Sequence, residues 1–253
     1  MIDQSPDEKA ASRLDNRMVS LGLAPTRAKA RDAILRGHVT VDGRKAEKPA
    51  QSVRSEAAIE VDDPAGDYVS RAALKLVAAL DHFGYSPEGL AALDLGASTG
   101  GFTEVLLRRG ARRVFGVDVG HGQLHRRIAE DPRVVNLEGL NARDLKPARI
   151  TEKVSAITAD VSFISLRLAL PPALSLAATP AWGVFLIKPQ FEVGREGVGK
   201  GGIVRDLALG RSAADGIATW IEKDKGWTVD GLIDSPIEGG DGNREYLIGV
   251  RRG

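Results

Sequence analysis

Three charged side chains follow short apolar runs, at the points where strands are expected to end. Asp118 comes after Val-Phe-Gly-Val, Asp160 after Ala-Ile-Thr-Ala, and Lys188 after Val-Phe-Leu-Ile. The carboxyl ends of neighbouring parallel strands share one edge of a sheet, and ligands bind at that edge in open α/β proteins. These positions therefore predict a ligand-binding edge that carries two carboxylates and a lysine.

A glycine-rich segment follows another short apolar strand, 93–95, and leads into a predicted helix over 104–109. Its glycines let the backbone approach a ligand, and N–H groups at the helix start point toward that ligand. The spacing G-x-x-x-G-G matches neither a dinucleotide-binding turn nor a phosphate-binding loop, which disfavours NAD and ATP. Asp118 lies 24 residues after Asp94, where a carboxylate can accept both hydroxyls of a ribose. A helix cap is the alternative role for Asp118.

Two further basic features could serve the same edge. Lys75 lies on a predicted helix over 70–83, on the side opposite its apolar face, where a solvated surface lysine is the alternative interpretation. A glycine-rich segment after Lys188 contains Arg195 and Lys200. It is interpreted either as a basic lid over a polyanionic substrate or as an unstructured surface loop.

Composition excludes several classes of site. The chain has 253 residues and no Cys, so disulfides, thiolate zinc sites and cysteine nucleophiles are excluded and a cytoplasmic location is expected. No metal is predicted, because His121 and His125 have helical spacing but no third ligand. The polar start lacks the apolar stretch of a secretory signal. The uncharged stretch 168–187 contains three prolines, which favour a helix end, a loop and a buried strand over 182–187 rather than a membrane span.

The charge distribution indicates two domains. Residues 13–54 hold ten Lys and Arg against four Asp and Glu, whereas the rest of the chain holds 25 basic and 30 acidic residues. The basic part predicts a helix before Gly22, a second helix from Thr26 to Gly37, and short strands over 39–41, 44–46 and 58–61. The predicted divisions are a polar tail over 1–12, a small α+β domain over 13–61, a linker over 62–67 and a larger domain over 68–253.

The larger domain alternates strands with helices, which predicts an α/β fold with a mostly parallel sheet covered on both faces. A helix is expected over 206–222, followed by strands over 227–233 and 245–250. The turn between those strands is too short for a crossover helix, so the last strand should run antiparallel.

The first domain resembles the S4-type RNA-binding domain in its RLD start, TRAKAR, GHVTVDGR and KP. The resemblance implies that its basic helical hairpin binds structured RNA by neutralising phosphates. The residues predicted to contact RNA are Arg13, Arg17, Arg27, Lys29, Arg31, Arg36 and Arg44, with Arg71, Arg195 and Lys200 added from the larger domain.

The larger domain resembles the Rossmann-like class I S-adenosylmethionine-dependent methyltransferases of the FtsJ-like branch, which methylate ribose 2′-hydroxyls. Together with the S4-like domain, the chain is identified as a member of the TlyA family, also labelled hemolysin A. The motifs are YVSRAALKL, ALDLGASTGGFT, GVDVGHGQL, ADVSFISL, LIKPQFEVGREGVGKGGIVRD and GNREYL. The resemblance implies a seven-stranded sheet whose last strand is antiparallel.

The resemblance also implies site residues. Its Lys-Asp-Lys-Glu tetrad falls on Lys75, Asp160, Lys188 and Glu245, with Lys188 activating the hydroxyl, Asp160 orienting Lys188, and Lys75 and Glu245 orienting the hydroxyl. S-adenosylmethionine would contact Asp94, Gly96, Ser98, Thr99, Gly100, Gly101, Phe102, Asp118 and Asp144. A target base turned out of the RNA stack could lie on Phe163 or Phe191.

The expected activity is 2′-O-methylation of cytidine in ribosomal RNA, with ribosomal RNA or ribosomal subunits as partners, no membrane partner, and no prediction of oligomeric state. Two alternatives stay open. A membrane-lytic hemolysin would need an amphipathic or spanning segment and a route out of the cell, and the sequence offers neither. A catalytically silent RNA-binding assembly factor would not need all four tetrad residues.

Overall fold

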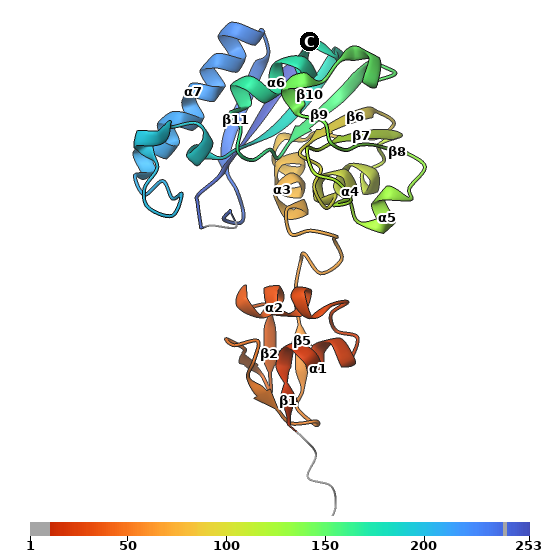
Figure 1. Cartoon of the computed structure of the whole chain (residues 1–253), viewed down its shortest axis with the longest axis vertical. Coiled ribbons are helices and arrows are strands. Elements are labelled where there is room, and N and C mark those ends of the chain that lie inside the picture. Colours follow the sequence, from red (N-terminus) through yellow and green to blue (C-terminus); the bar gives the residue numbers. More distant parts are fainter. Residues whose placement is uncertain (1–10, 240–241) are drawn as a thin grey trace, which may run out of the picture. The chain divides into compact units, whose positions relative to one another are not determined.

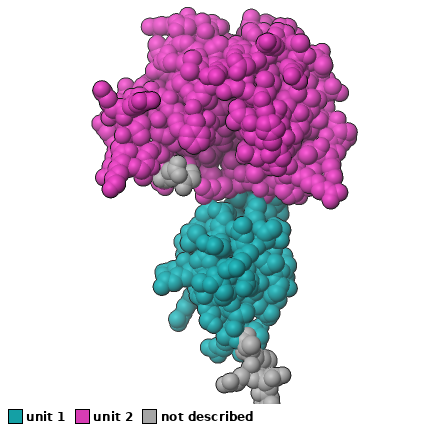
Figure 2. Space-filling view, viewed as in Figure 1, with its two compact units in different colours: residues 1–67 teal, residues 68–253 magenta. Residues whose placement is uncertain are grey.

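The computed structural model describes residues 11–239 and 242–253, which fold into two compact units divided between Asp67 and Tyr68. Figure 2 shows the two units in different colours. Each unit has its own hydrophobic core. The predicted tail over 1–12 lies outside the described residues except for Ala11 and Ser12.

The first unit packs two helices against short strands. Helix α1 (Leu14–Ser20) precedes α2 (Arg27–Leu35), whose N-cap Thr26 accepts a hydrogen bond from the Lys29 backbone N–H, as predicted. Strand β2 (Val39–Val41) pairs antiparallel with β3 (Arg44–Lys45) and with β5 (Ile59–Val61). Leu14, Met18, Ile34 and Val39 form the centre of the core.

Two features of this unit differ from the sequence expectations. A second sheet, in which β1 (Ser12–Arg13) pairs with β4 (Ser52–Val53), was missed because two residues are too few to show an alternating pattern. The expected linker over 62–67 is part of this unit. Arg36 holds it by donating to both carboxylate oxygens of Asp63, at 2.9 and 2.6 Å.

The second unit is built on one seven-stranded sheet (Figure 1). Its strand order is β11-β12-β10-β9-β6-β7-β8, and β12 alone runs antiparallel to its neighbours. This confirms the predicted α/β sheet with an antiparallel last strand. The strands are β6 (Ala91–Leu95), β7 (Arg113–Val117), β8 (Val134–Leu137), β9 (Val154–Ala159), β10 (Ala177–Ile187), β11 (Thr228–Asp234) and β12 (Tyr246–Arg252).

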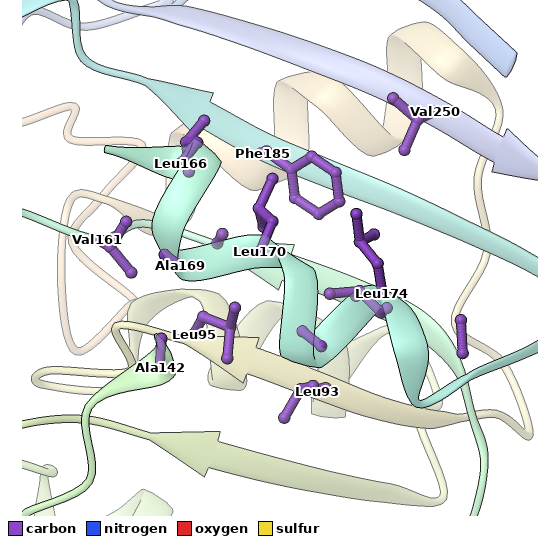
Figure 3. Packing of buried hydrophobic residues seen from close by; sticks show 14 of the residues in the cluster. Leu93, Leu95, Ala142, Val161, Leu166, Ala169, Leu170, Leu174, Phe185 and Val250 are labelled. Atoms are coloured by element: carbon purple, nitrogen blue, oxygen red, sulfur yellow. The ribbon is translucent and has the colours of Figure 1, made fainter. Parts of the chain in front are cut away.

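Helices cover both faces of the sheet. The pleat of β10 sends Phe185 and Ile187 into one core cluster and Val184 and Leu186 into another. The first cluster includes residues of α6 (Leu166–Ser175) and α7 (Leu207–Lys225), and Figure 3 shows α6 lying over the strands with Leu170 beside Phe185. The second includes residues of α3 (Ala73–Phe83), α4 (Gly101–Arg108) and α5 (Arg126–Ala129).

The stretch 168–187 differs from its predicted form. Pro171 and Pro172 lie inside α6 rather than after it, and β10 begins at Ala177 rather than after a loop. The prolines remove N–H donors to the carbonyls of Arg167 and Leu168, and both of those residues are exposed, so water can satisfy the freed oxygens. Among the described helices, none is long and apolar enough to cross a bilayer.

Candidate active site

The glycine-rich segment forms a tight connection between β6 and α4. Gly96 has a φ of +80°, and a Cβ there would lie 2.3 Å from the backbone oxygen of Asp160. Gly100 has a φ of +97° and faces Leu124 and Ile128. Only glycine satisfies both the backbone conformation and the close approach at these positions, so the segment lies directly against the end of β9.

Asp118 braces this segment from the end of β7. Its two carboxylate oxygens accept hydrogen bonds from the backbone N–H groups of Ser98, at 2.8 Å, and Gly120, at 2.7 Å. Ser98 itself has a φ of +46°, an uncommon conformation for a residue with a side chain. Each carboxylate oxygen has further acceptor capacity, so Asp118 can still bind a ligand hydroxyl.

Asp94 lies under the segment and is fully buried. Thr103 and Thr158 donate hydroxyl hydrogen bonds to its oxygens at 2.6 and 2.9 Å, which ties β6 to α4 and β9. Burial raises the pKa of the Asp94 carboxyl to about 6, although these hydrogen bonds oppose the shift. Asp94 therefore supports the segment from below and does not line the cavities beside it.

Two cavities, of 160 and 460 Å³, share Gly96, Ser98, Asp160 and Ser162 in their walls. Thr99, Gly101, Phe102 and Lys188 complete part of the smaller cavity, while Asp118 and Asn141 line the larger one. Asp144 is not brought to this wall: its carboxylate is 62% exposed and lies 3.6 Å from Arg143. Asn141 caps the short helix η1 (Ala142–Asp144) by accepting from the Arg143 N–H, and it lines the larger cavity where Asp144 does not.

Lys188 and Asp160 form an ion pair in the wall of the smaller cavity. The Lys188 Nζ lies 2.7 Å from Asp160 Oδ1, and the two side chains are 13% and 15% exposed. The same ammonium donates a hydrogen bond to the Ser162 hydroxyl at 2.8 Å. The Ser162 hydroxyl thus accepts the hydrogen bond of the lysine, while Asp160 Oδ1 pairs with it by charge without a hydrogen bond. Lys188 and Asp160 both line the cavity, so the pair can meet a ligand there.

Lys75 and Glu245 form a second ion pair, which is enclosed. Lys75 Nζ lies 2.5 Å from Glu245 Oε2, and the side chains are 8% and 2% exposed. The register of β10 and β12 pairs Ile187 with Tyr246, so Lys188 and Glu245 extend the same ladder by one residue on each strand. The structure thus brings the predicted tetrad to one sheet edge as two separate pairs. Neither Lys75 nor Glu245 lines the two cavities.

The glycine-rich segment after Lys188 is anchored at its C-terminal end. Asn243, 1% exposed, accepts from the Val204 N–H at 3.0 Å and donates to the Gly202 carbonyl at 2.9 Å. The segment includes the short helix η4 (Arg195–Gly197). Arg195 and Lys200 are exposed and stay outside the walls of both cavities.

The arginines predicted to contact RNA differ in what they do inside the first unit. Arg13 and Arg27 both bind the buried Asp15, and the Arg13 hydrogen bond in particular holds the pKa of that carboxyl well below its usual range. Arg36 binds Asp32 and Asp63, and Arg17 donates to the Ser55 carbonyl at 2.7 Å. Arg31 and Arg44 are exposed, while Lys29 is partly buried. Arg71, in the second unit, is also partly buried.

Sequence reasoning missed the partners that hold these groups. Ser162, Glu192 and Asn243 all fall within motifs that carry the family resemblance, but nothing in their spacing shows that they bind other parts of the site. Thr103 and Thr158, on either side of Asp94, were also missed. Their signal is a polar residue inside an otherwise apolar helix or strand, which requires a buried partner.

Comparison with known proteins gives the same two parts. Residues 68–252 match the FtsJ-like methyltransferase family model, and residues 12–59 match the S4 domain. The chain is 45% identical over 241 residues to the 16S/23S rRNA (cytidine-2'-O)-methyltransferase TlyA of Mycobacterium tuberculosis, covering 95% of this chain and 90% of that protein. It is 42% identical to Hemolysin A of Brachyspira hyodysenteriae, covering 93% of this chain and 98% of that one.

Among solved structures, a putative hemolysin from Streptococcus thermophilus superposes with a TM-score of 0.75 at 37% identity. The match covers 96% of this chain and 89% of that chain, so it includes both units. The chain belongs to the TlyA family, in which an S4 domain precedes an FtsJ-like methyltransferase domain.

Proposed function

We propose that the protein transfers a methyl group from S-adenosylmethionine to the ribose 2′-hydroxyl of cytidine in ribosomal RNA, either free or in ribosomal subunits. The observation that carries this proposal is the Lys188–Asp160 pair in the wall of a cavity that the glycine-rich segment also lines. The name of the M. tuberculosis relative supports the choice of cytidine and ribosomal RNA. With such a substrate, the protein would work in the cytoplasm.

The residues around the two cavities fit the cofactor. The smaller cavity gives the amino acid part a place beside Thr99, Gly101 and Phe102. Asp118 would bind the ribose, and Asn141 and Ala142 would border the base in place of Asp144. When bound, S-adenosylmethionine supplies a methyl group that its sulfonium makes electrophilic.

In this proposal Lys188 is the catalytic base. A ribose hydroxyl is a poor nucleophile at neutral pH, so transfer needs a group that accepts its proton as the new O–C bond forms. Lys188 is an ammonium in its pair with Asp160, so it must first release a proton to solvent through the cavity. The resulting amine then receives the hydroxyl proton at Nζ, while Asp160 and Ser162 stay beside the nitrogen. Holding the hydroxyl in line with the methyl carbon at about 3 Å supplies much of the remaining acceleration.

Lys75 and Glu245 have a supporting part in this proposal. Their pair is enclosed and lies outside the cavity walls, so it is suited to shaping the sheet edge beside Lys188. Direct orientation of the hydroxyl, the role implied by the resemblance, would require the Lys75–Glu245 contact to open when RNA binds.

The S4-like unit is proposed to hold the RNA through phosphate contacts, and the exposed Arg31 and Arg44 are among the cations that would make them. Near the proposed catalytic pair, Phe163 is 92% exposed and its ring centre lies 5.3 Å from that of Phe191. This ring pair gives a target base an aromatic surface for stacking.

The test is transfer of radiolabelled methyl groups to small subunits, large subunits and naked ribosomal RNA, with the labelled nucleotide mapped by resistance of its 2′ position to alkali. Label on a cytidine ribose is the expected result, and Lys188→Ala should abolish it while RNA binding persists. Unlabelled RNA together with intact cofactor and RNA binding would instead favour the silent assembly factor.

A further inference from the structure

Two segments carry the groups around Lys188. One follows β9 and runs from Asp160 to Leu166, and the other follows β10 and runs from Lys188 through the short helix η3 (Pro189–Phe191) to Glu192. At one end they are joined by Lys188, which contacts Asp160 and Ser162. Further along, Phe163 and Phe191 form a tilted ring pair.

Glu192 joins the same two segments at their far end. The Ser165 hydroxyl donates to Glu192 Oε2 at 2.6 Å, and the Leu166 N–H donates to Oε1 at 2.8 Å. Glu192 is partly buried, and this burial raises the pKa of its carboxyl although the two hydrogen bonds oppose the shift. The proposed mechanism gives Glu192 no task.

The two segments differ in how firmly the sheet holds them. Asp160 is fixed by its N–H, which donates to the Leu95 carbonyl at 2.8 Å, and by the close approach of Gly96 to its backbone. After Ile187, β10 ends and the chain turns into η3. The position of Lys188 relative to Asp160 therefore depends on the end of the β10–β12 ladder and on the contacts that the 188–192 segment makes at its far end.

We propose that Glu192 is a positioning residue for Lys188. By accepting hydrogen bonds from Ser165 and Leu166, Glu192 ties the 188–192 segment to the segment after β9 and so sets the direction of the Lys188 ammonium. This inference rests on the proposed function of Lys188. The competing explanation is that Glu192 only stabilises α6 by accepting from an N–H of its first turn.

The two explanations differ in what they predict for kcat. Glu192→Ala should lower kcat by about 10- to 100-fold, because small displacements of a reacting group cost that much, while the Kd for S-adenosylmethionine stays within about threefold. Glu192→Gln keeps an acceptor for Leu166 and can reverse the Ser165 bond, so it should restore most of kcat. Glu192→Asp keeps the charge but shortens the side chain and should give an intermediate kcat.

A matched control is Asp206→Ala, which removes a helix cap from α7, where Asp206 accepts from Ala208 and Leu209. Asp206→Ala should lower Tm without the loss of kcat that is expected for Glu192→Ala. The inference is overturned if Glu192→Ala keeps kcat, or if Glu192→Gln, folded and cofactor-bound, is as slow as Glu192→Ala. If Glu192→Ala does not fold, the Gln and Asp variants decide by the same criterion.

Hydrogen exchange separates failure of this inference from failure of the proposed function. In Glu192→Asp, the amides of residues 190–193 should exchange faster than in the wild type, while those of 94–103 keep their rates. Unchanged exchange over 190–193 would overturn the inference. A wild-type protein that methylates no RNA would overturn the proposed function, whereas the exchange result would still show whether Glu192 holds the segment.

Discussion

The two lysine–carboxylate pairs at the sheet edge have the same chemical groups in different surroundings. Lys188 and Asp160 line a cavity, and Lys188 has Ser162 as a second partner. Lys75 and Glu245 are almost fully enclosed and contact each other at 2.5 Å. An open pair can exchange a proton with a ligand, while an enclosed pair mainly resists being separated. Four residues that belong to one sequence motif therefore need not share one role.

Removing Lys188 should have the largest effect on catalysis. Lys188→Ala is expected to lower kcat by about 10²- to 10⁴-fold, the usual contribution of a positioned acid or base. Single-turnover methyl transfer at saturating S-adenosylmethionine measures it, with the cofactor Kd from calorimetry as the control. A kcat within threefold of the wild type would show that the open pair does not take the proton.

Breaking the enclosed pair should have the largest effect on folding. Glu245→Gln leaves the ammonium of Lys75 buried without its counter-charge and should lower the free energy of unfolding by about 3–5 kcal/mol. The matched variant Asp160→Asn, at the open pair, should cost much less because water and Ser162 can solvate Lys188. Urea unfolding of both variants tests the contrast. Equal losses of unfolding free energy in the two variants would show that the two pairs do not differ in their contribution to stability.

Asp94 sharpens the comparison because its partners are hydroxyl groups rather than an ammonium. Burial holds the pKa of Asp94 at about 6 in the folded protein, above the value of about 3.9 that is usual for aspartate. Ionisation therefore opposes folding, and the contribution of Asp94 to stability falls as pH rises from about 4 to 6. Asp94→Asn has no ionisable side chain at this position and therefore lacks this pH-dependent contribution to stability. The Tm of Asp94→Asn relative to the wild type should therefore rise by roughly 2–4 °C from pH 5 to pH 7, reflecting about 1 kcal/mol. A difference in Tm between Asp94→Asn and the wild type that does not change with pH would contradict the raised pKa of Asp94.

The smallest effect is expected at Ser162. Ser162→Ala removes the hydroxyl that accepts the hydrogen bond of Lys188 and should lower kcat by about two- to fivefold, the value of one modest hydrogen bond. Ser162→Thr keeps the hydroxyl and should recover kcat. A loss as large as that of Lys188→Ala would mean that Ser162 has a direct part in proton transfer.

Much of the fold could be predicted from local pattern. The apolar runs before Asp118, Asp160 and Lys188 are strands, and the turn before β12 correctly implied its antiparallel direction. The errors concern backbone groups whose hydrogen bonds are made with solvent or with strands far away in the sequence. Pro171 and Pro172 are accommodated in α6 because the freed carbonyls face water, and β1 finds β4 across 38 residues.

The family resemblance named the candidate site residues but not the contacts among them. Family motifs placed Lys188 and Asp160 correctly at one edge, but they could not show that Lys75 pairs with Glu245 rather than with a ligand. Asp144 remains a prediction. The resemblance implied that it contacts the cofactor, whereas its carboxylate is 62% exposed and lies outside the walls of both cavities.

The shared carboxylate of Asp15 has a consequence for how the S4-like unit responds to salt. Arg13 and Arg27 are already neutralised in part by Asp15, and Arg36 by two acids. Fewer condensed counterions are then released per arginine when RNA binds, because these cations bring their own counter-charges into the complex. The affinity for RNA should thus decline less steeply with ionic strength than the ten basic residues of 13–54 would suggest.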